Sequence, residues 1–123
     1  MNRKRGLEVL DEMLGKEAAR ETRRGWTRIA PDFEKYVVGF LSGEVWARPG
    51  LDRKTRSCIT LTALTALGHF DELALHVRAA LRNGLAPDEI KEVLLQAAVY
   101  CGVPAANRAF AVAQRTLAEE EVR

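Results

Sequence analysis

The sequence comprises 123 residues, of which 47% are hydrophobic and 29% are charged. This length predicts one domain over residues 1–123, and the composition is too apolar for a disordered chain. The net charge of +2 is too small to indicate a nucleic-acid-binding protein, which would carry a clustered basic face. Cys58 and Cys101 lie far apart in apolar segments. We therefore expect reduced thiols in a cytoplasmic protein, with neither a disulfide framework nor a zinc site.

The first half of the chain predicts helices with irregular boundaries. Residues 5–14 form an amphipathic pattern, and residues 17–29 form a second one that Gly25 interrupts. A proline begins a third predicted helix over residues 31–40. Residues 42–50 (SGEVWARPG) instead have the composition of an ordered loop. Functional residues are common in loops that a rigid scaffold holds.

Glycine and proline divide the second half into four predicted helices. A glycine follows each of the first three, where it suits the helix C-terminus, and a proline opens each of the last two. Apolar residues recur at three–four spacing, and no segment alternates with a period of two. The chain therefore predicts an all-α fold of about six to seven helices without a sheet. The four predicted helices span residues 53–67, about 71–83, 87–101 and 104–118.

Two side chains are candidates for proton transfer. His76 lies on an apolar helix stripe beside Leu73 and Ala80. It is either a core histidine bonded to a carbonyl group or a general acid/base in a dry pocket. Glu44 stands close to Trp46. It is either a solvated loop residue or a desolvated carboxylic acid that acts as a proton donor.

A basic cluster follows the predicted loop and contains Arg48, Arg53, Lys54 and Arg56. Three of these residues occupy the first turn of a predicted helix, where positive charge opposes the helix dipole. Either Asp52 offsets this charge, or an anionic ligand or a subunit partner does. We expect no metal site, because the two histidines lie seven residues apart without a carboxylate at ligand spacing. The sequence contains no phosphate-binding loop and no Cys-x-x-Cys pair.

Three stretches resemble the 4-carboxymuconolactone decarboxylase family: residues 43–57 (GEVWARPGLDRKTRS), 75–84 (LHVRAALRNG) and 89–107 (EIKEVLLQAAVYCGVPAAN). The wider superfamily includes alkylhydroperoxidase D, whose members carry a Cys-x-x-Cys-x-x-x-His relay with an upstream glutamate. His76 matches the relay histidine. The two cysteine positions hold His69 and Glu72, and the upstream glutamate position holds Ser57. The resemblance therefore favours the decarboxylase branch over the peroxidase branch.

The resemblance implies an alkylhydroperoxidase D-like helical domain in a ring-like homo-oligomer, a hexamer built from dimers or trimers. It implies a cytoplasmic lyase of aromatic compound catabolism, in protocatechuate degradation by the β-ketoadipate pathway. The implied reaction converts 4-carboxymuconolactone, a small lactone dicarboxylate, to 3-oxoadipate enol-lactone and carbon dioxide. The substrate's double bond is conjugated to the lactone carbonyl and accepts the released electrons, so we expect no cofactor. Nucleic acid and membrane are not expected partners.

Hypothetical roles follow from this chemistry. His76 and Glu44 are the predicted catalytic residues, and they protonate the dienolate or orient the proton donor. Arg48 and Arg56 bind the substrate carboxylates, and Trp46 excludes water. The alternatives are a thiol-dependent peroxidase-like member of the superfamily, a decarboxylase or isomerase of a related lactone, and a non-catalytic α-helical oligomeric module.

Overall fold

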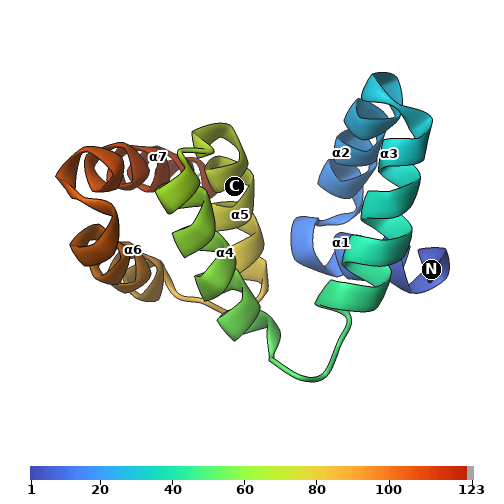
Figure 1. Ribbon diagram of the computed structural model, residues 1–123, viewed down its shortest axis with the longest axis horizontal. Helices are drawn as coiled ribbons and strands as arrows, with labels where there is room; N and C mark the ends of the chain where they lie inside the picture. Colours follow the sequence, from blue (N-terminus) through green and yellow to red (C-terminus); the bar gives the residue numbers. More distant parts are fainter. Residues whose placement is uncertain (122–123) are drawn as a thin grey trace. The chain divides into compact units, whose positions relative to one another are not determined.

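The computed structural model describes residues 1–121 and contains only helices and their connections within that range (Figure 1). Seven α-helices and one π-helix are present there, which confirms the all-α prediction. The helices form two compact units, of which unit 1 is Met1–Asp52 and unit 2 begins at Arg53. The single domain and the ring-like assembly stay predictions. None of the helices within residues 1–121 is long and apolar enough to cross a membrane.

Unit 1 is built on the pairing of its first helix with its π-helix. Figure 1 shows the π-helix continuing directly from the short helix before it. The core of the unit contains Leu10, Ala19 and Val38. The elements of unit 1 are α1 (Arg3–Leu14), α2 (Lys16–Ile29), α3 (Pro31–Tyr36) and η1 (Val37–Trp46).

Two sequence predictions for unit 1 are wrong. Residues 42–46 were expected to begin a loop, but they continue the π-helix to Trp46. Ser42 and Gly43 are buried in this helix, so tertiary packing overrides the local preference of serine and glycine for turns. Gly25 does not interrupt α2, which runs unbroken to Ile29.

Two glycines permit the close approach of α1 and η1. A methyl group on Gly6 would overlap the carbonyl oxygen of Val38, and one on Gly43 would overlap the carbonyl oxygen of Asn2. Both obstacles are backbone atoms, which cannot rotate away as a side chain can. The backbone of Asn2 also donates a hydrogen bond to the carbonyl of Gly39 at 2.9 Å. The glycines are therefore required by the available space, since neither has a positive φ.

Unit 2 has the helix boundaries that glycine and proline predicted. Gly68, Gly84 and Gly102 end helices with φ values of 75°, 106° and 92°, a backbone region that favours glycine. The buried core includes Leu61 and Leu94. Burial of each such side chain stabilises the fold by roughly 1.5–3 kcal/mol. The elements are α4 (Arg53–Leu67), α5 (Phe70–Arg82), α6 (Pro87–Cys101) and α7 (Val103–Glu121).

Candidate functional site

The predicted site residues fall in both units. Glu44, Trp46 and Arg48 belong to unit 1, whereas Arg56 and His76 belong to unit 2. Glu44 and Trp46 lie in the last turns of η1, and π-helical turns are rare and frequent at functional sites. Arg48 follows the helix, and its backbone N–H donates to the carbonyl of Val45 at 3.1 Å. The π-helix thus sets the local positions of all three unit 1 candidates.

Glu44 has a defined electrostatic partner in unit 1. Its Oε2 atom lies 3.1 Å from the amino nitrogen of Met1. The carboxylate is exposed within the unit, as is Arg48, whereas Trp46 is partly buried. The adjacent Gly43 permits this arrangement, because it lets the backbone of residue 2 pack against the end of η1. Sequence reasoning did not anticipate this contact.

His76 lies on the packed face of α5, as the sequence predicted. Its neighbours Leu73, Val77 and Ala80 are fully buried, while His76 itself is partly buried. Burial lowers the pKa of His76 below its usual value of 6.5, and the nearby Glu72 carboxylate opposes that shift. The imidazole is therefore mainly neutral at pH 7, so one ring nitrogen can accept a proton and the other can donate a hydrogen bond. Glu72 was missed as a partner, although its position four residues before His76 places both on one helix face.

Arg56 lies in the first turns of α4, which α5 and α6 brace. Asn83 donates a hydrogen bond to the hydroxyl of buried Ser57 at 2.9 Å. Lys54 Nζ lies 3.6 Å from Glu89 Oε2. The pKa of Glu89 is lowered by a hydrogen bond from the Ala86 backbone and by Lys54. Glu89 therefore offsets part of the basic cluster, a role predicted from sequence for Asp52, an anionic ligand or a subunit partner.

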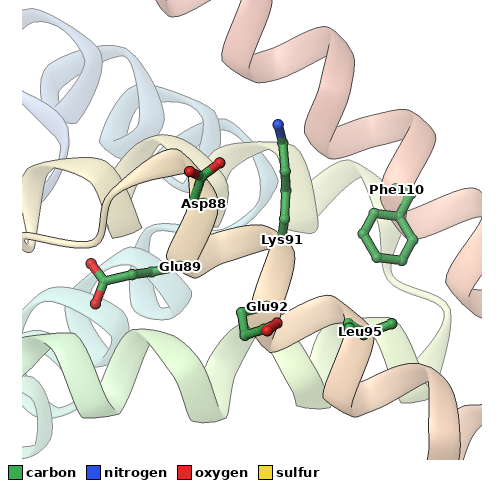
Figure 2. A pocket seen from close by; sticks show the side chains of 6 residues that line it. All are labelled: Asp88, Glu89, Lys91, Glu92, Leu95 and Phe110. Carbon is green, nitrogen blue, oxygen red and sulfur yellow. The ribbon is translucent and has the colours of Figure 1, made fainter.

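Two surface pockets of unit 2 have acidic walls. One, of about 460 Å³, is lined by five residues of α6 and by Phe110, which projects from α7 (Figure 2). The other, of about 400 Å³, includes Cys58 and Thr62 of α4. Glu89 and Glu92 line both pockets. Lys91 is the one basic residue of the first lining and the second has none, so carboxylates predominate in both and neither pocket favours a dicarboxylate. Within residues 1–121, no group of three or more His, Cys, Asp or Glu side chains is arranged to hold a metal ion.

Comparisons with known proteins identify relatives over most of the chain. The model of the carboxymuconolactone decarboxylase family matches residues 31–115. A 4-carboxymuconolactone decarboxylase of Acinetobacter baylyi is 43% identical over 111 residues, which cover 90% of this chain and 83% of that protein. A nitrosuccinic acid decarboxylase of Metarhizium robertsii is 39% identical over 112 residues, covering 91% of this chain and 78% of the relative.

A third relative, an uncharacterized 15.0 kDa protein of Paracoccus denitrificans, is 34% identical over 100 residues. These residues cover 80% of this chain and 75% of that protein. The matches span both units, since the family match begins at the first residue of α3 and ends within α7. The similarity therefore extends over most of the sequence, beyond the motif around Glu44 and the stretch around His76 that first indicated it. The chain belongs to the carboxymuconolactone decarboxylase family.

Proposed function

We propose that this protein decarboxylates 4-carboxymuconolactone and releases 3-oxoadipate enol-lactone and carbon dioxide. The observation that carries the proposal is the 43% identity to a 4-carboxymuconolactone decarboxylase over 90% of the chain. In this proposal the bond between the ring carbon and the carboxylate breaks. Its electron pair passes through the conjugated double bond into the lactone carbonyl, and a proton then adds to carbon. Because the substrate itself accepts the electrons, the proposed reaction uses no cofactor.

The proposed residue roles follow the chemistry of each side chain. His76 is the proposed proton carrier: its lowered pKa keeps the resting imidazole neutral, so it first takes up a proton and, as imidazolium, passes it to the dienolate carbon. Glu44 orients or relays that proton. Arg48 and Arg56 bind the carboxylates, because a guanidinium group forms paired hydrogen bonds with a carboxylate. Trp46 limits the access of water to the reacting carboxylate.

Nitrosuccinic acid is the second candidate substrate. A nitrosuccinic acid decarboxylase is 39% identical over 91% of this chain. Its named substrate is a small dicarboxylic acid whose nitro group accepts electrons, so both candidates carry their own electron sink. A thiol-dependent peroxidase activity is disfavoured, because His69 and Glu72 occupy the two cysteine positions of that relay. The alternative that is not an enzyme is a non-catalytic α-helical oligomeric module.

Turnover assays distinguish these candidates. Purified protein is incubated with 4-carboxymuconolactone, generated from protocatechuate by upstream enzymes, and in parallel with nitrosuccinic acid. Carbon dioxide release and the organic product are measured with a chelator and a thiol-blocking reagent present. Rapid turnover of the lactone supports the proposal. If only nitrosuccinic acid is turned over, it replaces 4-carboxymuconolactone as the proposed substrate. If the folded protein turns over neither compound, the non-catalytic module is favoured.

Variants test the assigned roles. His76→Ala and Glu44→Gln are expected to lower kcat, whereas Arg48→Ala is expected mainly to raise KM. Arg115→Gln is the matched control, because Arg115 is exposed on α7 and has no assigned role. If His76→Ala and Glu44→Gln both retained control turnover, the proton-transfer assignment would be wrong.

We also propose that the protein is a cytoplasmic homo-oligomer, with a hexamer as the expected state. Apolar side chains on α6 and the start of α7 support the proposal, since Leu95, Val99, Tyr100 and Val103 are 57%, 76%, 83% and 77% exposed. Exposed apolar patches of this kind mark interaction surfaces. Light scattering on wild type and on Val99→Asp tests the assembly, with Gln114→Asp as the charge-matched control. A wild-type monomer would refute the oligomer, and equal behaviour of both variants would refute this apolar face as its interface.

A further inference from the structure

One face of α2 carries arginine at the positions where an amphipathic helix usually carries apolar residues. The three–four spacing brings these side chains together on one side of the helix. With Glu34 of α3 they line a surface pocket of about 330 Å³, a volume typical of small-ligand sites. The α2 residues that line this pocket, which we term the arginine pocket, are Arg20, Arg23, Arg24, Thr27 and Arg28.

The carboxylate that lines the arginine pocket, Glu34, has its main ion-pair partner outside the pocket, and Arg23 adds a weaker attraction. Arg3 donates to both oxygens of Glu34, with distances of 2.8 and 2.9 Å. This pairing lowers the pKa of the buried Glu34 and keeps it ionised. Outside the lining, Glu21 lies 2.9 Å from a guanidinium nitrogen of Arg24. The arginines of the pocket therefore exceed the nearby carboxylates that balance them.

Arg23 is the partly buried arginine of the pocket, whereas Arg20, Arg24 and Arg28 are exposed. The Nε atom of Arg23 is buried, and no group within the described residues accepts its hydrogen bond. A buried donor without an acceptor is unfavourable, and charged donors carry the largest penalty. An oxyanion bound to the guanidinium groups that line the pocket would offset the repulsion among the four arginines.

We propose that the arginine pocket binds a small oxyanion, either a phosphate or a dicarboxylate. Guanidinium groups bind both through paired hydrogen bonds, which accounts for arginine at each charged position of the helix face. The small pocket favours a compact ligand over an extended polyanion. The site lies on α2 and α3 and contains none of the residues assigned to decarboxylation, so it does not depend on the proposed function.

Calorimetric titration of the full-length protein tests the site. Inorganic phosphate and succinate are titrated separately at constant ionic strength, and their Kd values identify which oxyanion is preferred. Arg23→Gln is expected to weaken binding by about tenfold or more, since a hydrogen bond to a charged group is lost. Arg115→Gln carries the same change in net charge and is expected to bind like wild type. Glu34→Gln removes the negative wall charge and is expected to tighten binding.

Circular dichroism checks that each variant retains its helices. If Arg23→Gln loses helical structure, Arg20→Gln replaces it, because the Arg20 side chain is exposed and its removal leaves no buried gap. Saturable binding that both pocket variants weaken, and Arg115→Gln does not, supports the proposal. The proposal fails if wild type binds neither anion saturably, or if Arg115→Gln weakens binding as much as the pocket variants. Because the readout is binding, an inactive decarboxylase would not affect the result.

Discussion

Replacement of Gly43 by alanine tests the packing that supports the predicted site residues of unit 1. The new methyl group would overlap the carbonyl oxygen of Asn2. That oxygen also accepts a hydrogen bond from the Gly6 backbone at 3.0 Å, so it cannot move without disturbing α1. We therefore expect Gly43→Ala to force α1 away from η1 and to shift the adjacent Glu44.

The expected loss of stability is a balance of two opposed effects. Overpacking of a tight contact costs typically about 1–3 kcal/mol. Alanine recovers up to about 1 kcal/mol through its higher helix propensity. Because the obstacle is a backbone atom, the overpacking cost lies at the upper end of its range, and the net destabilisation of Gly43→Ala is about 2 kcal/mol. Gly25→Ala is the matched control, because it lies inside α2 with no atom within 4 Å of its new methyl group. It is expected to stabilise unit 1 by roughly 0.5–1 kcal/mol.

Urea denaturation followed by tryptophan fluorescence measures the effect in the relevant unit. Both tryptophans of the chain, Trp26 and Trp46, lie in unit 1, so their emission reports the unfolding of that unit. The denaturation midpoint is expected to fall for Gly43→Ala and to rise for Gly25→Ala, at similar slopes. Equal midpoints for the two variants would refute the argument that η1 and the start of the chain are in backbone contact.

Three further predictions concern single groups. The free energy of unfolding of wild type is expected to fall as pH decreases below 6.5. The reason is that folding lowers the pKa of His76, so the unfolded chain binds the proton more readily. Thermal melts of His76→Gln should show a smaller decrease in melting temperature over the same pH range. Stability should fall again as pH drops below 4.5 and Glu34 is protonated. Glu34→Gln should reduce that second loss, to which Glu89 also contributes. In urea titrations at pH 7 it should lower the free energy of unfolding by about 1–2 kcal/mol, a modest cost because Arg3 is half-exposed. Asn83→Ala should lower the free energy of unfolding by about 1–3 kcal/mol, because the buried Ser57 hydroxyl loses its hydrogen-bond donor. Urea denaturation followed by circular dichroism measures this change. An unfolding midpoint equal to that of wild type would contradict the prediction.

The helices of unit 2 could be predicted from sequence because their limits are set locally. Gly68, Gly84 and Gly102 adopt positive φ at helix ends, and this preference is visible in the residue type itself. The segment 42–46 could not be predicted in the same way. Its helical state depends on packing against α1, which is distant in sequence. Serine and glycine there indicated a loop, whereas they in fact permit close helix contact.

For the candidate site, the sequence predicted the local position of His76 but not the contacts between helices. The apolar spacing of α5 placed His76 on a packed face, and the structure confirms that position. The pairing of Asn83 with Ser57 could not be found, since it joins two helices across 26 residues of sequence. The arginine pocket was also missed. The three–four spacing of its arginines is present in the sequence, but that spacing predicts a packed face only when the side chains are apolar.

The distribution of charge explains why the net charge argues against nucleic-acid binding and yet gives no sign of the arginine pocket. A net charge of +2 argues against a nucleic-acid-binding surface, yet it is the sum of opposed local surfaces. The α6 pockets carry Glu89 and Glu92, whereas the α2 pocket is lined by four arginines. An anionic substrate or ligand is repelled by the first and attracted by the second. The sign of the lining charge, and not the pocket volume, is therefore the reason for proposing the α2 pocket, and neither α6 pocket, as an anion site.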